Sequence, residues 1–297
     1  MKNTVIDLYL QRHKAILEQV LKHRPIPAPT MDSALKYALF PGGKRIRPVL
    51  VYLTGKLLDV ELNVLDVIAA SIELTHCYSL VHDDLPAMDD DDFRRGRPSC
   101  HKQYDEATAI LVGDGMQALA IEVLLTGLSS LIPASRVIKI TQELVQASGI
   151  SGMVSGQSLD LSELCRAELT EQDLQTIHQL KTGKLISACF SMVLASQEAI
   201  DPTIHTALIT YANHIGLVFQ IQDDFLDYYA PQNHLGKNRS SDLANQKTTF
   251  ASLFTKTQLE VKINDHYQQA LSCLNSFGNK AQPLIELTKQ LHHRSQL

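Results

Sequence analysis

Apolar residues recur along most of the chain at spacings of three and four, which is the pattern of helices that bury one face. The pattern predicts an opening helix, a second helix from Thr30, and a third that begins within residues 40–48. Further helices are predicted at residues 62–84, 103–131, 134–154, 170–196, 203–229 and 248–276. Alternation with a period of two, typical of strands, is hard to find. We therefore expect one all-α domain over residues 1–297, a bundle of ten or more helices.

Composition agrees with a soluble protein. Of the 297 residues, 44% are hydrophobic and 20% are charged, and the net charge of −5 offers no general attraction to nucleic acid. The first residues lack the apolar core of a signal peptide, and we find no segment that approaches a membrane span. The five cysteines are scattered and odd in number, which favours reduced thiols over disulfides or a zinc site. We expect a cytoplasmic protein that does not insert into membranes.

An acidic run stands out at residues 81–96, VHDDLPAMDDDDFRRG. At 100° per residue, the preceding helix places His76, Ser79, Leu80 and Asp83 close to one line. Pro86 clashes with a continuing helix, so an opened helix end would let Asp83 and Asp89 converge. Oxygen ligands of this kind suit Mg²⁺. A solvated acidic loop is the alternative, while a calcium loop is disfavoured because LPAM lacks its alternating ligands and central glycine.

A second acidic cluster lies at residues 216–229, GLVFQIQDDFLDYY. Its helical spacing places Phe219, Gln220, Asp223 and Asp227 on one face, with Asp224 about 100° away. Unpaired ionised groups are costly within an apolar helix, so basic partners or metal ions must compensate them. We expect the two acidic clusters to form facing walls of one central cavity.

Basic residues gather near the same segments, which indicates a polyanionic ligand held partly through metal ions. The alternative for any single cation is an exposed surface charge, and for His76 it is a histidine of the core. The basic groups comprise Lys44, Arg45 and Arg47, then Arg94, Arg95 and Arg97, then Lys181 and Lys184, and finally Lys237 and Lys247 in a polar stretch at 229–247.

Five motifs follow one another in a recognisable order: GGKRIRP at 42–48, DDLPAMDDDDFRRG at 83–96, KTGKL at 181–185, FQIQDDFLD at 219–227 and LGK at 235–237. Together they resemble the trans-isoprenyl diphosphate synthases, in particular the bacterial farnesyl or geranyl diphosphate synthases. The resemblance implies an isoprenoid synthase-like bundle around a central cavity, Mg²⁺ as cofactor and a homodimer. It also implies head-to-tail condensation of an allylic diphosphate, dimethylallyl or geranyl, with isopentenyl diphosphate.

The resemblance further implies roles for individual residues. Magnesium would be held by Asp83, Asp84, Asp89, Asp223 and Asp227. The allylic diphosphate would contact Arg94, Lys181, Thr182, Gln220, Lys237 and Lys247, and the residues expected to carry catalysis are Asp83, Asp89, Asp223 and Lys181. Isopentenyl diphosphate would contact Lys44, Arg47, His76 and Arg95.

Product length would be limited by Tyr78 and Ser79, which precede Asp83 by about one helical turn. Ideal geometry puts Ser79 on the line of Asp83 but Tyr78 about 140° away. The role of Tyr78 therefore comes from the resemblance alone, and a tyrosine that only packs in the core is the alternative.

The chain departs from the family pattern at Gln246-Lys247 and at Phe250-Ala251, and no role is assigned to Arg294 or to Asp90, Asp91 and Asp92. The leading expectation is a C15 product, with a geranyl diphosphate synthase that stops at C10 as the alternative. A terpene cyclase would not need the second-substrate cluster around Arg47. An inactive partner subunit is expected to have lost its carboxylates, and this chain retains both acidic motifs.

Overall fold

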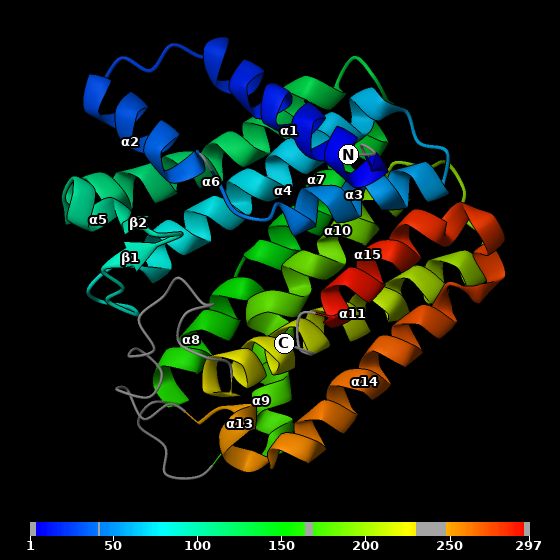
Figure 1. Ribbon diagram of the computed structural model, residues 1–297. Coiled ribbons are helices and arrows are strands. Elements are labelled where there is room, and N and C mark those ends of the chain that lie inside the picture. Colours follow the sequence, from blue (N-terminus) through cyan, green and yellow to red (C-terminus); the bar gives the residue numbers. More distant parts are fainter. Residues whose placement is uncertain (1–3, 41, 164–168, 230–247, 294–297) are drawn as a thin grey trace.

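The computed structural model describes residues 4–40, 42–163, 169–229 and 248–293, and these parts are almost entirely helical (Figure 1). The helices of the N-terminal half are α1 (Val5–Lys22), α2 (Pro29–Leu39), α3 (Ile46–Leu57), α4 (Leu62–Asp83), α5 (Cys100–Gln103), α6 (Glu106–Leu128) and α7 (Ala134–Ser148). Those of the C-terminal half are α8 (Met153–Glu163), α9 (Glu171–His178), α10 (Lys184–Ala195), α11 (Pro202–Tyr229), α13 (Phe250–Leu253), α14 (Lys256–Cys273) and α15 (Gln282–His293). The all-α prediction is confirmed.

Several boundaries differ from the predicted ones. The segment predicted as one helix at 134–154 ends at Ser148, and α8 begins separately at Met153. The predicted helix at 248–276 is divided into α13 and α14, because Thr255 adopts an extended conformation and caps α14 through the Gln258 backbone N–H. The helix α15 and the short hairpin of β1 (Phe93–Arg94) and β2 (Arg97–Pro98) were not predicted. Strands of two residues are too short to show periodicity, whereas α15 buries Leu284, Leu287 and Leu291 at helical spacing and could have been predicted.

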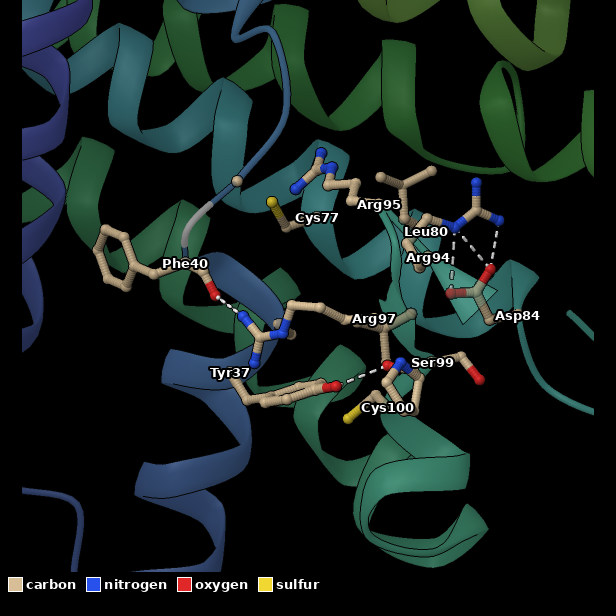
Figure 2. Close-up of a pocket in the computed structure, with 14 residues that line it drawn as sticks. Tyr37, Phe40, Cys77, Leu80, Asp84, Arg94, Arg95, Arg97, Ser99 and Cys100 are labelled. Carbon is tan, nitrogen blue, oxygen red and sulfur yellow. Dashed lines mark hydrogen bonds and ion pairs between the residues drawn. The ribbon is translucent and has the colours of Figure 1, made fainter. Parts of the chain in front are cut away.

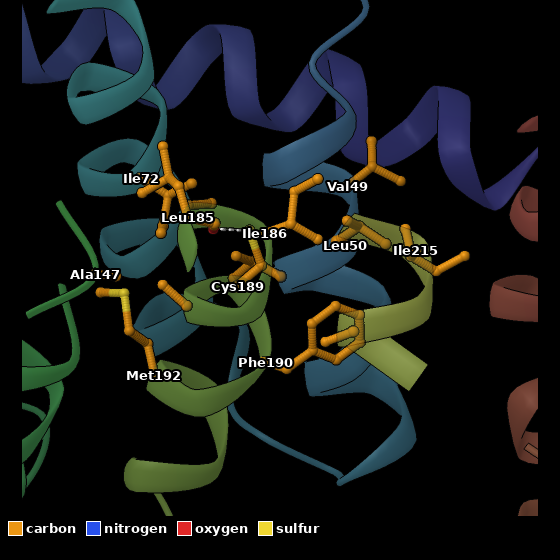
Figure 3. Close-up of a cluster of buried hydrophobic side chains, with 14 of the residues drawn as sticks. Val49, Leu50, Ile72, Ala147, Leu185, Ile186, Cys189, Phe190, Met192 and Ile215 are labelled. Carbon is orange, nitrogen blue, oxygen red and sulfur yellow. Dashed lines mark hydrogen bonds between the residues drawn. The ribbon is translucent and has the colours of Figure 1, made fainter. Parts of the chain in front are cut away.

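The core fills the space between α3, α4, α7, α10 and α11. Figure 3 shows side chains from these five helices that pack around α10, among them Leu50, Ile72, Phe190 and Ile215. The buried hydrophobic residues of the described chain form one cluster from Leu17 to Leu291. The single domain over residues 1–297 stays a prediction. The described cysteines, Cys77, Cys100, Cys189 and Cys273, are unpaired thiols as expected.

Two helices are long and apolar enough to cross a membrane by length and composition: α4 and α6. This differs from the sequence prediction that no segment approaches a span. The α4 window is 78% buried, so α4 is the central helix of the bundle, whereas the α6 window is only 39% buried. Figure 1 shows α6 beside α4 at the edge of the bundle. The exposed side of α6 therefore carries apolar residues that the described chain does not cover.

Candidate active site

The two acidic motifs face one cavity of about 1030 Å³. It is lined by the C-terminal part of α4, the loop and hairpin that follow it, the segment that leads into α3, and by α8, α9, α10, α11 and α13 with the turn between α9 and α10. Among the described residues predicted for the site, all but Asp84 line this cavity: Lys44, Arg47, His76, Tyr78, Ser79, Asp83, Asp89, Arg94, Arg95, Lys181, Thr182, Gln220, Asp223 and Asp227. Residues as far apart in the sequence as Lys44 and Asp227 thus meet in one cavity.

The first acidic wall is built by the end of α4. This helix ends at Asp83, and the chain folds back so that the Asp89 N–H donates to the Asp83 carbonyl at 2.9 Å. The opened helix end predicted from Pro86 is therefore present, and both carboxylates line the cavity. Burial raises the pKa of Asp83 to about 6; Lys181 lowers it, and Asp89 raises it further. The raised pKa of Asp83 is thus mainly an effect of its burial.

Asp84 points away from the cavity, into a smaller pocket beside it (Figure 2). Its buried carboxylate accepts a hydrogen bond from Arg94 Nε at 2.8 Å. Arg94 also forms an ion pair of 3.0 Å with Asp91. Asp91, which had no predicted role, thus helps to position Arg94 at the rim of the cavity. The assignment of Asp84 as a metal ligand stays a prediction.

The second acidic wall is the C-terminal part of α11, where Gln220, Asp223 and Asp227 line the cavity as their spacing predicted. Asp224 lies beside them and accepts a hydrogen bond from the Phe250 backbone N–H at 2.9 Å. Within the described parts of the chain, no three acidic, histidine or cysteine side chains gather closely enough to hold a metal ion by themselves. The carboxylates instead belong to two walls of one cavity.

Lys181 lies in a π-helical turn, Gln179–Gly183, between α9 and α10. Turns of this kind often occur at functional sites because they shift side chains out of α-helical register. Lys181 Nζ donates to Asp160 Oδ2 of α8 at 2.7 Å. The backbones of α8 and of this turn approach closely: a Cβ on Gly156 would lie only 2.2 Å from the backbone nitrogen of Lys181. Glycine at position 156 is thus required for this contact.

Sequence reasoning missed Asp160 and Gln157, both of which line the cavity from α8. Both polar atoms of the Gln157 side chain are buried and have no hydrogen-bond partner among the described residues. Buried polar groups normally have partners, so an unpaired amide beside a cavity fits a ligand-binding position. The sequence offered only a weak indication of this site, namely two polar residues three positions apart on one face of a short helix.

The predicted second-substrate cluster is basic. Arg47 Nη1 lies 3.3 Å from His76 Nε2, and burial, with Arg47 and Arg95 nearby, lowers the pKa of His76 well below its usual value. The imidazole is therefore neutral at pH 7. Arg47 Nε is buried and has no hydrogen-bond partner in the described chain, so it can donate to an anionic ligand. Lys44 lines the same part of the cavity.

The hairpin positions Arg95 by its backbone. Arg95 and Gly96 form the two-residue loop between β1 and β2, with φ of 57° and 74°. Two positive φ angles are the geometry of a type I′ turn. The Arg95 side chain lies against Gly43, where a Cβ would be 2.8 Å from Arg95 Nε. The glycine thus leaves room for an arginine beside Lys44.

Arg45 and Arg97 serve the fold rather than a predicted subsite. Arg45 forms an ion pair with the buried carboxylate of Glu73 and donates to the Leu39 carbonyl. Arg97 donates to the Phe40 carbonyl at 2.8 Å and stacks over the Tyr37 ring (Figure 2). These contacts connect α2, α3 and the hairpin around the basic cluster.

Tyr78 and Ser79 also line the cavity, although an ideal helix separates Tyr78 from Asp83 by about 140°. Tyr78 is only 6% exposed, and its ring contacts that of His82 edge to face. The predicted contacts of Lys237 and Lys247, the departure at Gln246-Lys247, and Arg294, which has no assigned role, lie outside the described residues.

Comparisons with known proteins agree with this geometry. The family model of the polyprenyl synthetases matches residues 28–282. A farnesyl diphosphate synthase of Haemophilus influenzae is 46% identical over 247 residues, which are 82% of each chain. A farnesyl diphosphate synthase of Escherichia coli is 40% identical and aligns with 93% of this chain and 92% of its own.

Solved structures are similar over nearly the whole chain. The geranyltransferase of Legionella pneumophila superimposes with a TM-score of 0.92 at 65% identity, covering 98% of this chain and 96% of that one. A geranyltransferase of Helicobacter pylori, complexed with magnesium and isoprenyl diphosphate, has a TM-score of 0.82 at 28% identity and covers 98% and 97%. The chain belongs to the polyprenyl synthetase family.

Proposed function

We propose that this protein is a farnesyl diphosphate synthase-type prenyltransferase, which joins dimethylallyl or geranyl diphosphate to isopentenyl diphosphate. One observation carries the proposal: two acidic walls and a separate basic cluster line the same cavity. The acidic walls suit a diphosphate bound through cations, and the basic cluster of Lys44, Arg47, His76 and Arg95 suits a second diphosphate bound directly. A terpene cyclase would need only the first of these two sites.

The donor set fits Mg²⁺. Carboxylates alone are hard oxygen ligands, and burial, the main cause of the raised pKa of Asp83, would be offset by a cation bound beside it. Asp83 and Asp89 on one wall and Asp223 and Asp227 on the other would hold the cation together with the diphosphate, because neither wall of the described chain brings three metal-ligating side chains together by itself. When bound, magnesium would stabilise the charge that develops on the departing diphosphate.

The protein's own residues would complete the reaction. Arg94 and Lys181 donate to the allylic diphosphate as its C–O bond breaks and its negative charge grows. Arg47 and Arg95 hold isopentenyl diphosphate so that its double bond meets the allylic cation. Bond formation leaves a tertiary cation on the isopentenyl unit, and a proton lost from a neighbouring carbon passes to the departing diphosphate as the new double bond forms. No side-chain nucleophile is required. Leu185, Ile186 and Phe219 line the cavity and exclude water from the cation.

We favour a C15 product. The Haemophilus and Escherichia relatives are named farnesyl diphosphate synthases, and the Legionella structure is named a geranyltransferase. Transfer of a geranyl group to a C5 diphosphate gives a C15 chain. A protein that stops at C10 is the alternative, and the product assay below separates the two.

We also propose that the protein is a cytoplasmic homodimer. Leu111, Ala118 and Leu125 are exposed on α6 at intervals of seven residues, and Ile138 and Val145 repeat this spacing on the adjacent α7. An exposed apolar face across two helices favours a second copy of the same face, because self-association buries both. Light scattering should give twice the mass of the chain, and Leu125→Glu should give a monomer.

The purified chain should be incubated with Mg²⁺, isopentenyl diphosphate and either the C5 or the C10 primer. Farnesyl diphosphate and pyrophosphate are the expected products, and a chelator should abolish their formation. A hydrocarbon released without isopentenyl diphosphate would identify a cyclase instead. The absence of any product with both substrates and Mg²⁺ would support the inactive-partner alternative.

A further inference from the structure

His82 lies one turn beyond Tyr78 on α4, and both residues line the cavity. Their rings meet edge to face with centroids 5.9 Å apart. Aromatic pairs in this arrangement stabilise one another beyond the area that they bury. The orientation of the Tyr78 ring therefore depends on His82 as well as on the backbone of α4.

The His82 ring rests on α6, where the absence of a side chain makes room for it. A Cβ on Gly113 would lie 2.0 Å from His82 Nε2, far inside van der Waals contact. The same nitrogen lies 3.0 Å from the Ile110 carbonyl oxygen. The space above Gly113 and that carbonyl together hold the ring against α6.

Tyr78 is also held from α6. Gln117 Nε2 donates to the Tyr78 hydroxyl at 3.5 Å, one turn along α6 from Gly113. None of the cavity-lining residues comes from α6. Tyr78 and His82 thus form a single layer of side chains between the cavity and α6. Contacts with α6 fix the position of both rings.

We propose that His82 is a further specificity-determining residue for product length: seated on Gly113, it keeps the Tyr78 ring across the path of the growing chain. This inference rests on the proposed prenyltransferase function. Without the His82 contact, the Tyr78 ring has more freedom to turn aside, and the cavity then accepts a longer product. The effect acts on which product leaves, and it requires no change in the rate of ionisation.

Product length in two variants tests the proposal. With isopentenyl diphosphate in excess over geranyl diphosphate, His82→Ala should raise the ratio of C20 to C15 product about three- to tenfold, the loss expected for one aromatic contact. Gly113→Ala should raise the ratio in the same direction, because the new Cβ displaces the His82 ring. Gly115→Ala is the matched control on α6, since a Cβ there meets only Met31 Cε at 3.8 Å.

The double variant His82→Ala/Gly113→Ala should match His82→Ala alone, because Gly113 acts through the His82 ring. Additive effects of the two changes would overturn the proposal. So would a C20 to C15 ratio that stays at the native value in His82→Ala, or one that Gly115→Ala raises equally. A native chain that forms no prenyl diphosphate would refute the proposed function and this inference together. Native C15 synthesis with unchanged variants would refute the inference alone.

Discussion

Replacement of Asp160 by asparagine tests the electrostatics of the active site most directly. Lys181 Nζ lies 2.7 Å from Asp160 Oδ2, and both side chains are about one-fifth exposed. Burial by itself would lower the pKa of Lys181, but Asp160, followed by Asp83 and Asp89, raises it above the usual value. Asp160 is thus the strongest of the charges that hold the ammonium group in place.

The expected loss follows from the strength of that contact. A hydrogen bond to a charged group contributes roughly 1.5–3 kcal/mol, and each 1.4 kcal/mol is about a factor of ten in rate. Asparagine preserves the shape of the side chain but removes the charge. Lys181 is then drawn toward Asp83 and Asp89, where it competes with cations. We expect kcat/KM for geranyl diphosphate to fall about 10- to 100-fold.

Steady-state kinetics with one substrate varied at a time provide the assay. The KM for isopentenyl diphosphate should change much less than kcat/KM for geranyl diphosphate. Glu171→Gln is the matched control, because Glu171 accepts from Lys262 Nζ at 2.6 Å and does not line the cavity. A kcat/KM within about twofold of native in Asp160→Asn, or an equal loss in the control, would refute the reasoning.

Three further outcomes are expected. Asp223→Ala should reduce turnover by about two orders of magnitude or more, since removal of one transition-state charge contact costs that much; near-normal turnover would contradict the metal assignment. Arg95→Ala should raise the KM for isopentenyl diphosphate about 10- to 100-fold and leave that for geranyl diphosphate nearly unchanged, and equal changes would argue against two separate subsites. Burial, with Arg45 nearby, lowers the pKa of His13 to about 3; protonation therefore favours the unfolded chain below pH 6.5, and this group should remove about 2 kcal/mol of the unfolding free energy between pH 7 and 5. Urea unfolding of the native chain and His13→Gln checks this, and the variant should lose less stability over that range.

The periodicity of apolar residues was sufficient to predict the helices that dominate the fold, because each must bury one continuous face. It did not predict the break after Ser148. There, a Cβ on Gly152 would lie 2.2 Å from the Ala147 carbonyl oxygen, a contact set by the local path of the chain. Nor did it predict the hairpin around Arg95, whose strands contain two residues each. Elements this short are stabilised by neighbours rather than by their own pattern.

The sequence alone determined which residues could carry the chemistry: two carboxylate motifs, the arginines and lysines near them, and the helical faces on which several of them lie. Tertiary structure decided how those residues divide their tasks. Asp84 pairs with Arg94 instead of facing the cavity, and Arg45 pairs with Glu73. Asp160, on a helix outside the five motifs, accepts a hydrogen bond from Lys181. These choices depend on which backbones approach closely enough for a contact, and that is set by packing between segments far apart in the chain.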